Sequence, residues 1–187
     1  MEGVKKLYDE MDWRKIEGKW NNEPDHLSID NGEYHLVVFR NSVGTLNGYV
    51  GVRVDNPLFG KSNEHSYLDY IGVHGGLTFS GSGYHSYEFK NTHWYFGFDT
   101  NHYTDLAPSI IAIEKAMEGS FNPLSALLSS SVSIKQEYRD LNYVTENVNS
   151  LYEQLMSISN DLGKKETSHI RMYRKLHRLK KKHEQWY

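Results

Sequence analysis

The residues best able to do chemistry lie between Ile71 and Asp105. His74 is followed there by two glycines, and Asp99, His102 and Asp105 come later at intervals of three. Imidazole and carboxylate groups are the usual metal ligands and proton carriers of proteins. A spacing of three places side chains on one side of the chain wherever a helical turn begins. This stretch therefore predicts a site, although its residues do not name a reaction.

The sequence leaves three interpretations of this group open. Asp99, His102 and Asp105 would suit a divalent metal, the one cofactor that the pattern suggests, and His74 would add a fourth ligand. As catalytic residues, the same four would do acid–base work, with an aspartate fixing the tautomer of a histidine. They could instead contact a ligand without chemistry. In the purely structural interpretation, an aspartate caps the helix that follows.

The glycines after His74 lie inside a strand-like run. Paired glycines in a strand mark a bulge or a close backbone approach. Their exposed amides could cradle a phosphate, although no Gly-Lys-Ser/Thr follows, as a nucleoside-triphosphate loop requires. The glycines and the neighbouring aromatic residues predict a ligand pocket. Its predicted residues are His74, Gly75, Gly76, Thr78, Trp94, Asp99 and His102.

The composition excludes several classes of protein. The 187 residues contain no cysteine, which rules out disulfides, zinc–thiolate sites and a thiol nucleophile. The Gly-x-Ser-x-Gly elbow of serine hydrolases and the His-Glu-x-x-His signature of zinc proteases are absent. No apolar run approaches the roughly 20 residues that span a bilayer, and the N-terminus lacks the apolar core of a signal peptide. We therefore expect a soluble, cytoplasmic protein without membrane contact.

Residues 21–125 predict an α+β core domain with a small antiparallel sheet and flanking helices. β-Branched and aromatic residues between turn-forming residues indicate the strands. The predicted strands are Tyr34–Arg40, Leu46–Val54, Ile71–Ser80 and Trp94–Asp99. Ser80–Gly83 predicts a flexible turn, and Tyr84–Phe89 an extension of a hairpin. We expect His74 and Asp99 to lie on neighbouring strands.

Short helices are predicted on either side of this sheet. Apolar residues within 1–20 indicate an N-terminal segment of one or two amphipathic helices. Ser109–Met117 predicts another short helix, which Gly119 and Pro123 would close.

Residues 130–187 predict a helical, coiled-coil-like arm. Apolar residues repeat with a heptad spacing from Ile134 to Leu162, which is typical of a coiled coil or a helical hairpin. Gly163 would end this helix, and a second, basic helix would complete an antiparallel arm. A homodimer formed through the same apolar seam is the alternative.

The end of the chain is strongly basic. From Lys164 to Tyr187 there are nine lysines and arginines and two glutamates, which gives this segment a net charge of +7. Because the whole chain has a net charge of −3, the residues before Lys164 carry a net charge of −10. Such a tail binds acidic partners, nucleic acid included, or folds back onto the body. The predicted partner-binding residues are Arg171, Arg174, Lys175, Arg178, Lys180, Lys181 and Lys182.

Four motifs carry a resemblance to a known family. They are Gly48-Tyr49-Val50-Gly51-Val52, Asn56-Pro57-Leu58-Phe59-Gly60, Val73-His74-Gly75-Gly76-Leu77-Thr78, and Trp94 to Asp99 continued by His102 and Asp105. In this order they resemble a widespread family of small accessory proteins of bacteriophages and prophages. The resemblance covers about Gly48 to Pro108, a third of the chain. Arg53 stands where a proline is expected, and Thr100 where a small residue or cysteine is common.

The resemblance implies an anti-defence protein of the host bacterial cytoplasm. Its leading form is an inhibitor that binds a bacterial immune component. That component would be a nucleotide immune signal in the predicted pocket, or a protein–RNA assembly such as a CRISPR effector on the basic tail. The alternative is a metal-dependent phosphoesterase or nuclease that uses His74, Asp99, His102 and Asp105. A structural or assembly protein that uses the coiled coil is a further alternative.

Overall fold

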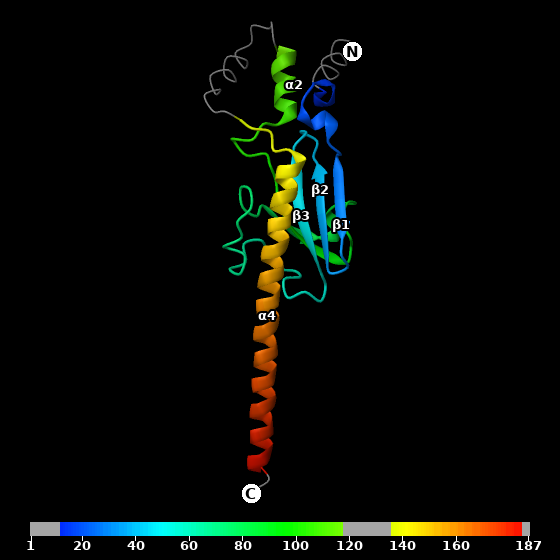
Figure 1. The fold of residues 1–187 in the computed structure, drawn as a ribbon. Coiled ribbons are helices and arrows are strands. Elements are labelled where there is room, and N and C mark those ends of the chain that lie inside the picture. The colour runs from blue at the N-terminus through cyan, green and yellow to red at the C-terminus, as the bar shows by residue number, and fades with distance from the viewer. Residues whose placement is uncertain (1–11, 118–135, 185–187) are drawn as a thin grey trace.

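The centre of the molecule is a five-stranded antiparallel sheet with strand order β1-β2-β3-β5-β4 (Figure 1). The computed structural model describes residues 12–117 and 136–184, and the side chains of the last helix as far as Lys165. The strands are β1 His26–Asp30, β2 Tyr34–Arg40, β3 Leu46–Arg53, β4 Phe79–Ser82 and β5 His93–Phe98. The helices are α2 Pro108–Met117 and α4 Leu141–Glu184, with 3-10 turns at Trp13–Lys15, Lys19–Asn22 and Gly83–His85. The predicted α+β class is confirmed.

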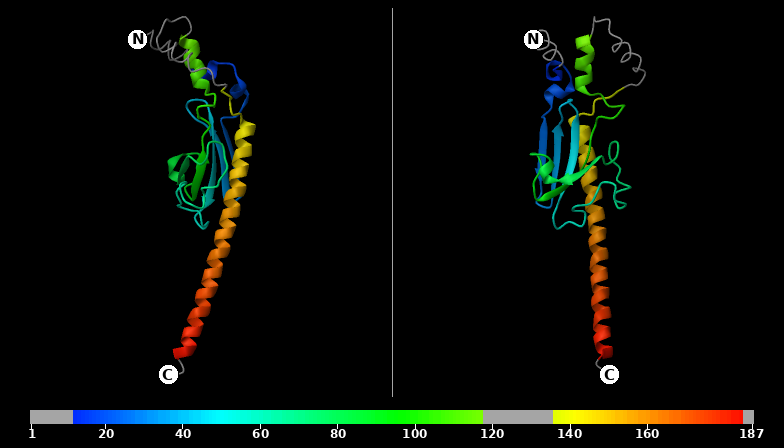
Figure 2. Two further views of the ribbon diagram at one scale, coloured as in Figure 1. Left: turned by 90° about the vertical axis from the view of Figure 1, so that its left-hand side faces the viewer. Right: turned by 180° about the vertical axis from the view of Figure 1, so that it is seen from behind.

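Helix α4 covers one face of the sheet (Figure 2). The apolar side chains of this layer come from β2, β3, β5, the first half of α4 and the connection between β3 and β4, which adds Leu58, Leu68 and Ile71. The fully or nearly fully buried ones include Val38, Val50, Val52, Phe96, Phe98, Val144, Val148, Leu151 and Leu155. Gly48 of β3 lets the helix come close, because a Cβ atom at Gly48 would lie 2.5 Å from Val148 Cγ2. The heptad seam is therefore buried against the protein's own sheet, and the predicted coiled coil is wrong for this half of the helix.

A second apolar cluster covers the opposite face of the sheet. Tyr95 of β5 is fully buried there and stacks on Phe89, with ring centroids 3.9 Å apart. Val37 and Tyr49 complete its buried part. The chain between β4 and β5 supplies Phe89, so this connection closes the second face. Both faces of the central strands are thus covered, which explains why β2 is buried at nearly every position.

The predicted strand from Ile71 to Ser80 is wrong in most of its length. Only Phe79–Ser82 pairs with β5, and the preceding residues form a loop. Gly75 and Gly76 have φ values of +65° and +84°, which an extended strand does not allow. His74 therefore lies on this loop and Asp99 just beyond β5, so neither is on a strand as expected. The predicted flexible turn at Ser80–Gly83 is mostly strand β4.

The elements on either side of the predicted strands give one further difference and one confirmation. Strand β1 was not predicted. Its Leu27 and Ile29 alternate with polar residues, but this edge strand is short and mostly exposed. The predicted helix Ser109–Met117 is confirmed as α2. The remaining predicted helix signals within residues 1–11, and those at Gly119, Pro123 and Ile134, lie outside the described residues.

Helix α4 is continuous through Gly163, so the predicted antiparallel arm of two helices is wrong. Its 44 residues run along the sheet and then continue past it, as Figure 1 shows. The last buried side chain described on α4 is that of Ser159. Among the described residues, no helix has both the length and the apolar content needed to cross a membrane.

Candidate functional site

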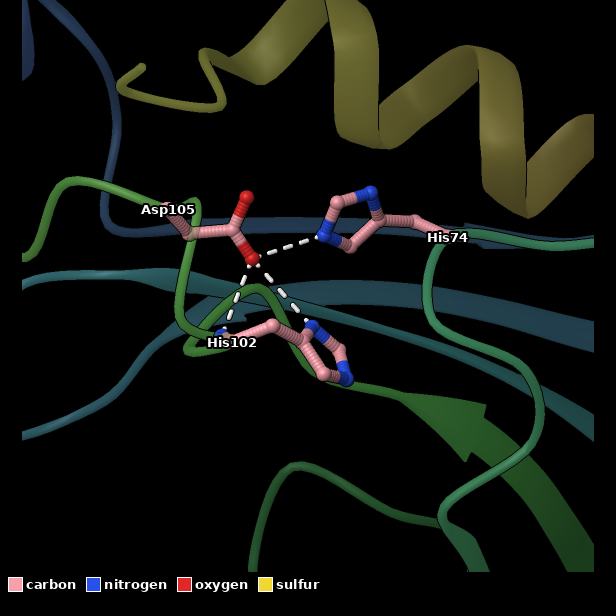
Figure 3. A group of neighbouring side chains, drawn as sticks. All are labelled: His74, His102 and Asp105. Atoms are coloured by element: carbon pink, nitrogen blue, oxygen red, sulfur yellow. Dashed lines mark hydrogen bonds and ion pairs between the residues drawn. The ribbon is translucent and has the colours of Figure 1, made fainter. Parts of the chain in front are cut away.

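Three side chains predicted from the sequence converge in the structure: His74, His102 and Asp105 (Figure 3). Asp105 Oδ2 lies 2.7 Å from His74 Nε2 and 3.2 Å from His102 Nδ1. The backbone N–H of His102 donates to the same oxygen at 3.0 Å. The Asp105 side chain is fully buried, while that of His102 is 34% exposed. Solvent therefore reaches the group on the His102 side.

A turn and a short bridge hold Asp105 in place. The turn closes when Asp105 N donates to His102 O at 2.9 Å, so the spacing of three brings these two residues together. Asp105 also pairs as an isolated parallel bridge with Glu137. This bridge places Arg139 beside the carboxylate, where Arg139 Nε donates to Asp105 Oδ1 at 2.9 Å. Both oxygens of Asp105 therefore have partners.

Three polar side chains of α4 fix the loop that carries His74. Gln154 both accepts from Gly72 N at 2.8 Å and donates to Gly72 O at 3.0 Å. Asn147 Oδ1 accepts from His74 N at 3.0 Å, and the Tyr143 hydroxyl lies 2.9 Å from His74 Nδ1. Intervals of four and seven put these side chains on one face of the helix. Helix α4 thus sets the position of the His74 ring.

The two glycines after His74 have different roles. Both have a left-handed backbone, which favours glycine. A Cβ atom on Gly75 would lie 2.1 Å from Cε1 of the His102 ring, whereas one on Gly76 would meet open space. Gly75 therefore makes room for His102, and Gly76 serves only the turn. The predicted close approach at these glycines is an approach to His102.

The charge of Asp105 is stabilised although the side chain is buried. Burial by itself would raise the pKa of this carboxyl, but hydrogen bonds from Arg139, His74 and the His102 backbone outweigh it and lower the pKa. The ion pair also raises the pKa of Arg139, chiefly through its hydrogen bond to Asp105. Asp105 is therefore an anion in the folded protein, and it can orient both imidazole rings.

Asp99, the fourth predicted residue, does not join this group. Its Oδ2 accepts from the Thr78 hydroxyl at 3.0 Å, and its Oδ1 accepts from Asn101 N at 3.0 Å. Trp94, predicted for the ligand pocket, donates from Nε1 to Lys61 O at 2.8 Å and packs against the main core. Asp99 therefore fixes the turn after β5, and Trp94 anchors the chain that follows β3.

Sequence reasoning missed four residues of the site: Arg139, Tyr143, Asn147 and Gln154. A stripe of polar residues spaced by four and seven beside the apolar seam was the available signal for the three on α4. Arg139 has no such signal, because only the bridge to Asp105 places it. The arrangement as a whole can orient imidazoles for proton transfer or hold a divalent ion.

Comparison with known proteins adds no relative. No protein-family model matches the chain, and neither the curated proteins nor the solved structures include a significant match.

Proposed function

We propose that this chain is a binding protein whose projecting helix engages a polyanionic partner. Following the resemblance to phage accessory proteins, the proposed partner is a protein–RNA component of bacterial immunity, met in the bacterial cytoplasm. The protein would act as an anti-defence inhibitor by occupying this partner. The proposal rests on the second half of α4, which extends beyond the body, meaning the sheet and the segments packed on it (Figure 1).

Helix α4 continues well past the sheet (Figure 1), and Leu162 is the last of its described side chains that packs against the core. Leu151, Leu155 and Ser159 are buried, whereas Asn160, Asp161 and the two lysines at Lys164 and Lys165 are exposed. At about 1.5 Å per residue, the helix from Asn160 to Glu184 is roughly 37 Å long. Helices in proteins gain most of their stability from tertiary packing, so a projecting helix of this length is best explained by a partner.

The charge of this segment favours a polyanion as that partner. The net charge of +7 between Lys164 and Tyr187 contrasts with −10 on the rest of the chain. Lysine and arginine neutralise phosphates and release counterions, which supplies most of the sequence-independent affinity for nucleic acids. The three consecutive lysines Lys180, Lys181 and Lys182 concentrate this charge near the end of the helix.

The predicted nucleotide pocket is less well supported than the helix. Thr78 donates to Asp99, Trp94 donates to Lys61 O, and His74 contacts Asp105 and Tyr143. These side chains use their polar groups within the protein. A nucleotide would have to replace these contacts, whereas a partner on the helix would not.

Salt dependence of RNA binding tests the proposal. Fluorescence anisotropy with a labelled single-stranded RNA should give an affinity that falls steeply with salt. Replacing Lys180, Lys181 and Lys182 by glutamine should weaken binding and reduce the slope of log K against log[salt] by up to about 2, because each single-strand contact contributes about 0.7. The control replaces Lys15, Lys61 and Lys115 on the body, which changes the net charge equally and should leave the slope nearly unchanged.

A truncation that ends at Gly163 tests the same proposal in cells. The full chain should restore plaque formation by a phage that a bacterial immune system otherwise blocks, and the truncated chain should not. Pull-down from these cells should recover RNA with the full chain only. Full inhibition or full RNA affinity in the truncated chain would contradict the proposal, as would equal losses in the two triple-lysine variants.

A further inference from the structure

Two imidazole nitrogens converge on one carboxylate oxygen at the His74 site. Asp105 Oδ2 also accepts a hydrogen bond from the His102 backbone, so three nitrogen donors share this oxygen. A carboxylate offers about four lone-pair sites over its two oxygens, so three donors on one oxygen are more than its lone pairs accommodate well. A cation placed between the two ring nitrogens and this oxygen would be bound by all three atoms, and the two rings would no longer have to donate to the same oxygen. We propose that His74, His102 and Asp105 bind a divalent first-row transition metal ion, with zinc as the reference ion.

The distances are near those of a bound ion, and small shifts of the ligand atoms would complete the fit. Tetrahedral zinc bonds of about 2.0–2.1 Å place neighbouring ligand atoms about 3.3 Å apart. Asp105 Oδ2 lies 2.7 Å from His74 Nε2 and 3.2 Å from His102 Nδ1, and all three ligand atoms lie within 4.8 Å of one another. The His102 ring is partly exposed and can shift to open the group. Asp105 Oδ2 and His74 Nε2, now 2.7 Å apart, would have to separate by about 0.6 Å.

The neighbours of the ligands match the outer contacts of protein metal sites. A metal-bound histidine usually donates its other ring N–H to an oxygen, and ligating carboxylates are themselves hydrogen-bonded. His74 Nδ1 lies 2.9 Å from the Tyr143 hydroxyl, and Asp105 Oδ1 accepts from Arg139. With the metal on Nε2, the His74 Nδ1–H would donate to Tyr143. Both outer contacts are already present in the folded protein.

The ligand types select the class of ion. Two imidazoles and one carboxylate suit zinc and the other later divalent transition metals better than magnesium or calcium, which prefer oxygen ligands. Arg139 brings a positive charge near the site, but Glu137 pairs with it at 2.9 Å and offsets this charge. Three protein ligands leave a further coordination position, and the exposed side of His102 is where water or a ligand would take it.

Titration of the metal-free full chain with Zn²⁺ and Co²⁺ tests this proposal. Competition with a chelator should show one Zn²⁺ per chain, and bound Co²⁺ should show a visible absorption spectrum whose intensity reports the coordination number. His102→Ala and His74→Ala should abolish stoichiometric binding. Tyr143→Phe should weaken binding about 10–100-fold, which is typical when an outer contact of a ligand is lost.

A pair of glycine variants gives the sharpest control. Gly75→Ala places a Cβ atom against the His102 ring and should displace that ligand, whereas Gly76→Ala strains a similar left-handed backbone with no neighbour. We expect metal binding to be lost in Gly75→Ala and retained in Gly76→Ala. Far-UV circular dichroism checks that both variants remain folded. Asp99→Asn and His85→Ala, outside the group, should bind as the unchanged protein does.

This inference stands apart from the proposed function, because the site lies on the body and the truncation at Gly163 leaves it intact. Metal binding that survives in His102→Ala and in Gly75→Ala would overturn it. So would a folded, unchanged protein that takes up no stoichiometric Zn²⁺ or Co²⁺. RNA binding and its salt dependence are measured separately and bear only on the projecting helix.

Discussion

His35 is a buried histidine whose hydrogen bonds define its neutral form. Lys90 N donates to the Tyr95 hydroxyl at 2.8 Å, which leaves the hydroxyl hydrogen for His35 Nδ1 at 2.5 Å. His35 Nε2 then carries its hydrogen towards Ser28 Oγ at 2.7 Å. Burial raises the pKa of Tyr95 to about 12, so this hydroxyl stays protonated. A proton on His35 Nδ1 would remove the acceptor of the Tyr95 hydrogen.

We predict that acid destabilises the protein through His35. Burial, and secondly the charge of His26, lowers the pKa of His35 below its ordinary value of 6.5. The unfolded chain therefore binds more protons, so this stability is present above about pH 6.5 and is lost as the pH falls below it. A single group changes the free energy of unfolding by at most about 1.4 kcal/mol per pH unit. Urea unfolding between about pH 7.5 and 5 measures this slope.

His35→Gln is the matched variant for this prediction. It keeps a polar side chain but does not titrate, so the slope of stability against pH should become smaller. Part of the slope should remain, because burial also lowers the pKa of His93. His85→Gln, in an exposed position, should leave the slope unchanged. An unaltered slope in His35→Gln would show that another group carries the acid sensitivity.

At the scale of single elements, the two halves of α4, which meet near Ser159, have different roles. The first half buries the apolar seam on the sheet and positions the His74 loop through Tyr143, Asn147 and Gln154. The second half extends beyond the sheet. Gly163 lies close to the division, inside the helix, and a Cβ atom there would meet open space.

We predict that Gly163→Ala stabilises the helix at this point. Glycine inside a helix costs about 0.5–1 kcal/mol relative to alanine, because more backbone freedom is lost on folding. Hydrogen exchange of the amides around residue 163 should slow by the corresponding factor, and helical circular dichroism should rise. If Gly163 instead ended the helix with a left-handed backbone, alanine would speed exchange and lower the helical signal. Gly32→Ala, at a φ of +89° in the β1–β2 turn, should be destabilising.

At the scale of the whole molecule, the body is complete without the projecting helix. The buried side chains described on α4 end at Ser159, and the sheet is covered on both faces by residues before it. The basic tail is therefore not required to close the core.

We predict that a chain truncated after Gly163 unfolds with nearly the stability of the full chain. The loss should be below about 0.5 kcal/mol, the usual range for changes away from the core. Urea unfolding followed by tryptophan fluorescence measures it. Truncation after Asn149 is the control, because it removes the buried Leu151 and Leu155 and should abolish cooperative unfolding. A large loss in the first truncation would show that the tail folds back onto the body.

The sequence by itself determined the elements whose pattern is local. Strand Tyr34–Arg40 follows from its β-branched and aromatic residues between turn-forming residues, and helix α2 follows from helical spacing. The pairing of His102 with Asp105 also follows from their spacing of three, because one turn joins them. Such features depend on neighbours in the chain, so the order of residues was enough to find them.

Only the tertiary structure decided which distant residues meet. His74 contacts Asp105, 31 residues away in the sequence, and Tyr143, 69 residues away. Asp99 is nearer to Asp105 in the sequence than His74 is, yet it contacts Thr78 instead. The apolar seam of α4 could equally have packed on a second chain, and its pattern is the same for either partner. In the folded chain the seam packs on the protein's own sheet, where Gly48 has no side chain and lets the helix approach closely. Periodicity specifies which face of an element is apolar. The path of the connecting loops determines which other element packs against that face.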